Sequence, residues 1–257
     1  MTDTSLATLD VQGPIATLTL NRPEARNALS LDLLAALHHR ADELAAIPEV
    51  TVLVLTGAGK SFCSGMDLRA VLGNHALALT LLTSLGDLTV KLRSLPMVLV
   101  AKVNGAAIGG GCGLTTVCDF AVTHADSKMG FPEVDMGVCP AVVAPWLVRR
   151  LGPGKARAVL LRGGLMSGAE AHALGLVTTA VPHADDLSAA VAGLAADLAR
   201  GGADALRATK GLLNELDGYA GMGGDVELVR RAAALSAQVL STPEAQARLR
   251  AKLGGGG

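Results

Sequence analysis

The chain has 257 residues and a formal net charge of −1 at pH 7; half of its residues are hydrophobic and 18% are charged. This length and composition allow a sizeable buried core, which argues against a disordered protein. The near-zero charge and the 2% aromatic content argue against a nucleic-acid surface, which needs basic and stacking side chains. Because the sequence shows no signal peptide and no apolar run of membrane-spanning length, we expect a soluble, cytoplasmic protein.

The spacing of apolar residues predicts strands that alternate with helices. The predicted strands cover residues 6–20 (two strands), 50–55, 97–103, 120–123 and 177–181. The predicted helices cover residues 31–47, 76–95, 187–200, 204–216 and 226–239, and two more start at Pro140 and Pro243. We expect residues 129–137 to be extended. This order of elements is typical of an α/β fold.

Two glycine-rich turns each follow a predicted buried strand. One covers residues 57–68, and the other covers residues 104–113, which include the consecutive Gly109, Gly110 and Gly111. Neither turn has the glycine spacing of a dinucleotide fingerprint or of a phosphate-binding loop. A helix that starts after such a turn directs free N–H groups at whatever lies in front of it. The turns therefore indicate a site that stabilises developing negative charge.

The four cysteines are Cys63, Cys112, Cys118 and Cys139. They form no Cys-x-x-Cys pair and no histidine spacing typical of a metal site accompanies them, so we expect buried free thiols and no metal. Cys112 lies inside the second glycine turn, where a helix N-terminus could lower its pKa. A nucleophilic role for Cys112 therefore stays open.

Several segments are similar, in sequence and in order, to the enoyl-CoA hydratase/isomerase (crotonase) superfamily. The matching segments are residues 21–29, 62–68, 104–113, 118–119 and 131–140, with a weaker match at 208–210. The resemblance implies an α/β fold built as a crotonase-like spiral of ββα units. In that fold residues 1–195 form the core with the coenzyme A site and the active site. Residues 196–257 form a helical C-terminal region that makes trimers, often paired into hexamers.

The superfamily stabilises the enolate oxygen of an acyl-CoA thioester with two backbone N–H groups. The resemblance assigns these groups to Met66 and Gly110, and it assigns the acid/base to Glu133. Contacts with the substrate and its coenzyme A part are implied for Arg26, Ser64, Asp67, Leu68, Gly109, Pro140 and Ala141. Coenzyme A is part of the substrate, so the resemblance implies no separate cofactor.

The sequence departs from the two-glutamate hydratases of the superfamily at Gly113, where those enzymes carry their first glutamate. The second glutamate is present as Glu133, and its apolar neighbours would raise its pKa if it is buried. Asp135 lies two residues further on, on the same side of an extended segment, and could partly replace the missing acid. A single carboxylate could instead carry a proton between C2 and C4 of a substrate.

We therefore expect a lyase of fatty acid metabolism, an enoyl-CoA hydratase that adds water to a 2-enoyl-CoA thioester. One alternative is a Δ3-Δ2 enoyl-CoA isomerase with a single glutamate, and another is a catalytically idle protein that binds acyl-CoA. A thioester hydrolase or acyltransferase that uses Cys112 is a third. The expected partners are an acyl-CoA substrate and further copies of the chain in a homotrimer or hexamer. We expect no nucleic acid and no membrane.

Overall fold

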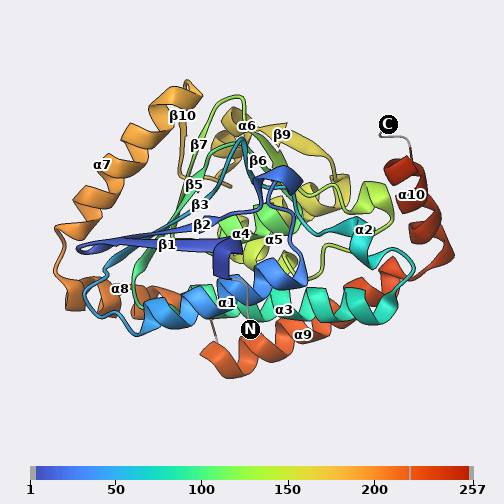
Figure 1. Cartoon of the computed structure of the whole chain (residues 1–257), viewed down its shortest axis with the longest axis horizontal. Coiled ribbons are helices and arrows are strands. Elements are labelled where there is room, and N and C mark those ends of the chain that lie inside the picture. Colours follow the sequence, from blue (N-terminus) through green and yellow to red (C-terminus); the bar gives the residue numbers. More distant parts are fainter. Residues whose placement is uncertain (1–3, 220, 255–257) are drawn as a thin grey trace.

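The structure, a computed structural model, describes residues 4–219 and 221–254 and shows two β-sheets surrounded by helices (Figure 1). The larger sheet has the strand order β1-β2-β3-β5-β7-β10. Its strands are β1 (Ala7–Gln12), β2 (Ile15–Leu20), β3 (Val52–Gly57), β5 (Val98–Val103), β7 (Phe120–His124) and β10 (Thr179–Val181). All neighbouring pairs are parallel except β1 and β2. The carboxyl ends of β3 and β5 therefore lie side by side, as the repeat of strand, glycine turn and helix predicts.

The smaller sheet has the order β4-β6-β8-β9 and was not predicted from the sequence. Its strands have three residues each: β4 (Ser61–Cys63), β6 (Ala106–Ile108), β8 (Lys128–Gly130) and β9 (Leu165–Ser167). The strands β4 and β6 lie within the two glycine turns and pair in parallel, with Ser61 opposite Ala106. The strands β4 and β6 are thus neighbours, as β3 and β5 are, and their pairing holds the two turns together.

The helices follow the predicted order, with two corrections. They are α1 (Leu31–Ala45), α2 (Leu68–Val71), α3 (His75–Ser94), α4 (Gly110–Val117), α5 (Ala144–Arg162), α6 (Gly168–Leu174), α7 (Leu187–Ala199), α8 (Ala203–Leu216), α9 (Gly221–Leu240) and α10 (Pro243–Gly254). Short 3₁₀ turns are η1 (Thr4–Leu6), η2 (Pro23–Ala25), η3 (Val134–Met136) and η4 (Ala184–Asp186).

The first correction is that Pro140 does not open α5, which begins four residues later at Ala144. The second correction is that residues 129–137 are not extended throughout, because η3 coils the second half of this segment. In contrast, the Ser30 cap of α1 is confirmed, since its side chain accepts a hydrogen bond from the Leu33 N–H at 3.2 Å. No helix in the described part of the chain combines the length and the apolar character needed to span a membrane.

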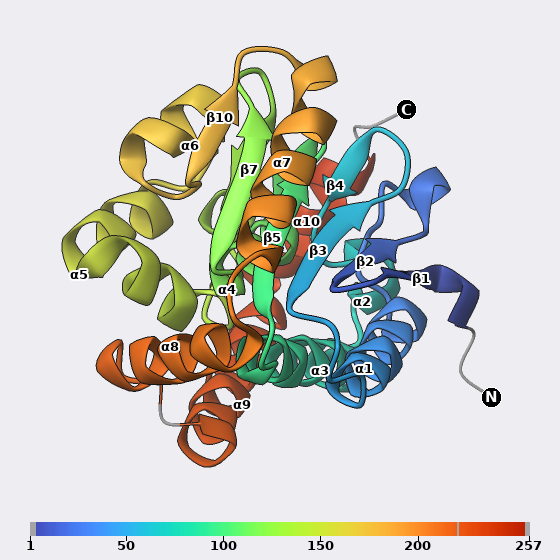
Figure 2. The same ribbon diagram turned by 90° about the vertical axis from the view of Figure 1, so that its left-hand side faces the viewer.

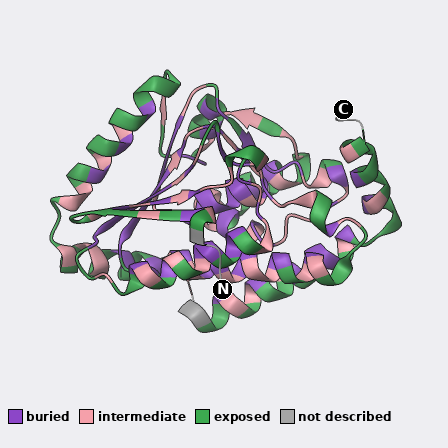
Figure 3. Ribbon diagram, in the orientation of Figure 1, coloured by how far each residue is buried: buried purple, intermediate pink, exposed green. Residues whose placement is uncertain are grey.

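Helices cover both faces of the larger sheet. On one face α7 packs its apolar side on the sheet (Figure 2), through the cluster Val52, Val54, Val100, Val122, Leu187, Val191 and Ala195. The other face packs on the main core, at whose centre α4 is buried (Figure 3). Below this core α3 and α9 run side by side, and a Cβ on Gly86 of α3 would lie only 3.1 Å from Val229 Cβ of α9. The absence of a side chain on Gly86 therefore lets α3 and α9 pack closely against each other.

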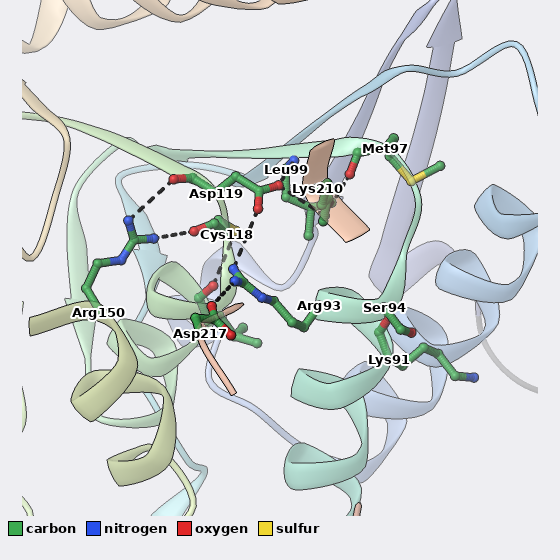
Figure 4. Close-up of polar contacts among 11 residues, drawn as sticks. Lys91, Arg93, Ser94, Met97, Leu99, Cys118, Asp119, Arg150, Lys210 and Asp217 are labelled. Carbon is green, nitrogen blue, oxygen red and sulfur yellow. Dashed lines mark hydrogen bonds and ion pairs between the residues drawn. The ribbon is translucent and has the colours of Figure 1, made fainter. Parts of the chain in front are cut away.

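An ionic cluster ties α8 to the larger sheet (Figure 4). The Lys210 ammonium lies 3.0 Å from the Asp119 carboxylate and donates a hydrogen bond of 2.8 Å to the Met97 carbonyl. Asp119 also accepts the Leu99 N–H at 2.8 Å, and Arg93 lies 3.6 Å from its other oxygen. Only 7% of the Lys210 side chain is exposed, and burial lowers the pKa of its ammonium. Removal of the Lys210 ammonium would leave the largely buried Asp119 carboxylate with less compensation for its charge.

We predict that Lys210→Ala lowers the free energy of unfolding by about 3 kcal/mol, measured by urea denaturation, because the partly buried carboxylate of Asp119 loses the nearer of its two cationic partners. The matched control is Arg200→Ala, which breaks the exposed pair of Arg200 with Asp197. That variant should change stability by about 0.5 kcal/mol or less, as exposed ion pairs do. Equal effects of the two substitutions would contradict a structural role for the cluster.

Candidate active site

The two glycine turns meet just beyond β4 and β6. Gly65 has a φ of +91°, and a Cβ on it would lie 2.7 Å from the Ile108 carbonyl oxygen and 3.8 Å from the Gly110 nitrogen. Glycine alone combines this left-handed conformation with such a close approach. The backbone around Met66 therefore lies against the start of α4, where Gly110 is the first helical residue.

Two asparagines hold the first turn in place. Asn27 is fully buried, and its amide N–H groups donate to the carbonyls of Ala58 at 3.0 Å and Ser61 at 2.9 Å. Asn104 donates to the Gly57 carbonyl at 2.9 Å and accepts the Gly57 N–H at 3.3 Å. These side chains pair backbone groups that the turn itself leaves unsatisfied. The sequence places both residues in segments that match the superfamily but gives no sign of this role.

Two backbone N–H groups, those of Met66 and Gly110, have no hydrogen-bond acceptor in the described part of the chain. Leu29 pairs with both neighbours of Met66, donating to the Gly65 carbonyl at 2.8 Å and accepting the Asp67 N–H at 3.0 Å. The Met66 N–H thus points away from this bridge, and Gly110 lies in the first helical turn, where N–H groups have no intrahelical acceptor. Among residues 4–219 and 221–254, neither N–H has a hydrogen-bond acceptor. The pair is suited to bind an oxygen that gains negative charge.

Glu133 is the carboxylate of the site. It precedes η3, and its carbonyl accepts the N–H groups of Met136 at 3.0 Å and Val138 at 2.8 Å. Its Oε1 lies 2.8 Å from the position of a Cβ on Gly109, a residue with a φ of +54°. Its Oε2 is buried and has no hydrogen-bond partner in the described structure. Burial raises the pKa of Glu133 to about 7, and the nearby negative charge of Asp135 adds to this rise.

A largely apolar pocket surrounds these groups. Its apolar side chains include Leu82, Leu85, Ile108, Met136, Val138, Val142 and Val143, and its polar side chains are Ser64, Glu133, Cys139 and Ser236. The Ser236 hydroxyl donates to the Cys139 carbonyl at 2.7 Å and accepts the Ala141 N–H at 3.2 Å. Glu133 is the single charged side chain among the described residues that line the pocket.

Ser236 was not predicted from the sequence, and α9 brings it to the pocket from about 100 residues away. A signal was present, because this serine interrupts a stripe of buried residues at helical spacing, Val229, Ala233, Ala237 and Leu240. A buried hydroxyl in such a stripe needs a partner, and here the partners are the backbone groups of residues 139 and 141.

The structure brings most of the predicted site residues together. Met66 and Gly110 line the pocket with Glu133, as do Ser64, Leu68, Gly109 and Pro140. Three of the residues predicted to contact the substrate lie outside the lining. Arg26 is exposed on the adjoining loop, where its carbonyl accepts the Ser64 N–H at 3.0 Å. Asp67 pairs with Arg22 at 2.9 Å, and Ala141 contributes its N–H to Ser236.

Two sequence-based hypotheses receive no support from the geometry. Asp135 is exposed because η3 turns it away from the pocket, and its carboxylate accepts the Gly164 N–H at 2.9 Å. Cys112 is fully buried, and burial raises the pKa of its thiol to about 12, so the proximity of a helix N-terminus does not make it a thiolate. All four thiols are free. In the described part of the chain, no three His, Cys, Asp or Glu side chains gather as they would around a metal ion.

The raised pKa of Glu133 predicts a pH-dependent stability. Its folded pKa lies above the ordinary value of 4.5, so the folded state binds the proton more tightly and loses stability as pH rises toward 7. We expect Glu133→Gln to remove roughly 2 to 3 kcal/mol of the difference in unfolding free energy between about pH 5 and pH 8. Urea denaturation at both pH values measures this difference. The control is Glu49→Gln, because Glu49 is exposed, and it should show the same difference in unfolding free energy between the two pH values as the wild type. A wild-type difference in Glu133→Gln as well would contradict a buried Glu133 carboxyl.

The sequence and the structure of this chain are similar to those of known proteins. The sequence profile of the Enoyl-CoA hydratase/isomerase family matches residues 10–217. A crotonyl-CoA hydratase of Syntrophomonas wolfei is 32% identical, over 85% of this chain and 83% of that protein. A 2,3-dehydroadipyl-CoA hydratase of Escherichia coli is 34% identical, over 79% of this chain and 80% of that protein. The crystal structure of an enoyl-CoA hydratase from Mycobacterium avium superimposes with a TM-score of 0.84 and 29% identity, over 97% of this chain and 96% of the other. The chain belongs to the enoyl-CoA hydratase/isomerase family and has the crotonase fold.

Proposed function

We propose that this protein adds water across the C2=C3 bond of a 2-enoyl-CoA thioester. The observation that carries the proposal is the buried, unpartnered Oε2 of Glu133, in an apolar pocket that also presents the free N–H groups of Met66 and Gly110. The N–H pair binds the thioester oxygen, where charge develops as water attacks C3. Because these donors are fixed before the reaction, they need no reorganisation as the charge forms.

The remaining lining residues suit the rest of the substrate. Ser64, Leu68 and Gly109 border the pocket on the side of the glycine turns and are proposed to contact the pantetheine part of coenzyme A. Arg26 is exposed on the loop bonded to Ser64, where its guanidinium could reach the phosphates. Coenzyme A arrives with the substrate, and the proposed reaction needs no metal and no separate cofactor.

Hydration is favoured over isomerisation and over an idle binding role. Isomerisation from Δ3 to Δ2 would use the same N–H pair and the same carboxylate, but the relatives at 32% and 34% identity are both named as hydratases. An idle binding protein would have no use for a carboxyl whose pKa lies near neutral pH, where it can exchange protons at low cost.

We also propose that the protein is a homo-oligomer, as the family resemblance implies. The α8 helix exposes Leu212, Leu213 and Leu216, with between 56% and 74% of each residue accessible in the single chain. Neighbouring leucines of this exposure on one helix are typical of a surface that another subunit covers.

The test of the proposed function is to incubate the purified protein with crotonyl-CoA and follow the product by mass spectrometry. We expect addition of one water, and a decrease in kcat of about 10³-fold in Glu133→Gln, which keeps the shape of the side chain but cannot transfer protons. The control Glu49→Gln should act as the wild type. Conversion of 3-hexenoyl-CoA without any hydration would favour isomerisation, and thermal stabilisation by acyl-CoA without turnover would favour the binding protein.

The lining also predicts which acyl chains are accepted. None of the described pocket residues carries a positive charge, so a carboxylate at the far end of the acyl chain would be buried without a partner, at a cost of several kcal/mol. We expect kcat/KM for 2-hexenoyl-CoA to exceed that for 2,3-dehydroadipyl-CoA, which has the same number of acyl carbons, by at least about 100-fold. Equal values for the two thioesters would show that the charged end reaches solvent or a cation.

A further inference from the structure

The space for a second carboxylate is filled. Gly113 is buried in α4 and does not line the pocket, and a Cβ on it would overlap the Val143 side chain, which precedes α5. Val143 itself is 3% exposed and forms part of the pocket wall. An apolar side chain thus occupies the region into which a longer residue at position 113 would extend.

The other polar groups of the pocket are poor proton carriers. The Ser236 hydroxyl is engaged with two backbone groups, and the nearby carboxylate of Asp135 points to Gly164. Burial, together with the charge of Glu133, raises the pKa of the Cys139 thiol. Ser64 has a hydroxyl, which does not titrate near neutral pH. Glu133 remains as the one group in the described lining that can both take and release a proton near pH 7.

The carboxyl of Glu133 is placed both to take a proton from water and to give one to C2. Oε1 lies beside Gly109, next to the N–H of Gly110 that binds the thioester oxygen, while Oε2 is buried with no competing partner. A water that attacks C3 and the carbon C2 that later accepts a proton are adjacent atoms on one face of the substrate. One carboxyl group in front of that face can reach both.

We infer that Glu133 alone carries the proton of hydration, taking it from the attacking water and returning it to C2. This inference rests on the proposed function. Its carboxylate removes one proton from water, the water oxygen bonds to C3, and the π pair of C2=C3 moves to give an enolate whose oxygen binds Met66 and Gly110. The enolate then re-forms the carbonyl as C2 takes the proton from the Glu133 carboxyl. The carboxylate is regenerated, H and OH have been added, and nothing is oxidised or reduced.

A site with one carboxylate and a site with two differ in their pH profiles. A single carboxylate must be ionised in the free enzyme, so kcat/KM for crotonyl-CoA should rise with pH to a midpoint near pH 7 and then stay level. Two cooperating carboxyls, one ionised and one protonated, would give a bell-shaped profile. The charged and titratable groups near Glu133 are Asp135 on its own turn, Cys112 on α4, Cys139, and Arg248 on α10, which contacts the Asp135 carbonyl.

The experiment records this profile for the wild type, Asp135→Asn and Cys139→Ala. We expect one rising limb in all three, whatever their rates, with the midpoint shifted to lower pH in Asp135→Asn because a negative charge near Glu133 is lost. A bell-shaped wild-type profile whose alkaline limb disappears in Cys139→Ala or Asp135→Asn would identify a second acid and overturn the inference.

The stereochemistry of hydration in deuterated water is an independent readout. A single carboxyl on one face must add deuterium at C2 and oxygen at C3 on the same side of the former double bond. Addition to opposite faces would overturn the inference while leaving the hydratase function intact. Failure to hydrate any 2-enoyl-CoA, despite binding it, would overturn both.

Discussion

The site depends on the contact between two stretches of backbone, at Gly65 and at Ile108 to Gly110. A side chain on Gly65 would collide with the Ile108 carbonyl, so the two glycine turns approach this closely because Gly65 has no Cβ. The parallel pairs β3 with β5 and β4 with β6 bring the turns to this crossing from separate parts of the sequence. This contact fixes the spacing of the two N–H donors, and rigid donors are what stabilise a developing oxyanion.

The Glu133 carboxylate comes from a third segment of the chain, and its position also depends on a glycine. Gly109 leaves room for Oε1 of Glu133, and the apolar wall excludes water from Oε2. The same burial that raises its pKa lowers stability at neutral pH, so the fold must oppose that cost elsewhere. The C-terminal helices contribute, because Ala245 of α10 lies against Gly137 and Ser236 of α9 binds the backbone after Val138. Residues far from the motifs therefore hold the Glu133 segment in place.

Much of this arrangement follows from the sequence. The apolar periodicity predicts the long strands and helices, and the glycine turns predict two N–H donors at neighbouring strand ends. The strands β4 and β6 were missed because three residues are too few to show alternation and glycines surround them. The expectation that Asp135 lies in an extended segment, on the same side as Glu133, is wrong for a similar reason. Two residues of separation place side chains on one side of a strand, but η3 coils this segment.

Contacts between distant residues could not be predicted from the sequence. The sequence shows that a glycine stands at position 113, where the two-glutamate hydratases carry a carboxylate. Only the packing of α5 on α4 shows that Val143 fills the space beside it. Ser236 stands in an apolar stripe whose partner loop the sequence does not identify. The depth of burial that brings the pKa of Glu133 to about 7 is likewise a property of the assembled pocket.

The most direct test of the proposed N–H pair and of Glu133 is a crystal structure of the protein with a bound 3-hydroxyacyl-CoA. We expect the thioester oxygen to lie about 2.7 to 3.1 Å from the nitrogens of both Met66 and Gly110, as in other oxyanion sites. We also expect one Glu133 oxygen to lie within hydrogen-bond distance of the 3-hydroxyl group, on the face of C2 that Glu133 protonates. A thioester oxygen bound elsewhere, or a 3-hydroxyl held by another side chain, would contradict the proposed roles of Met66, Gly110 and Glu133.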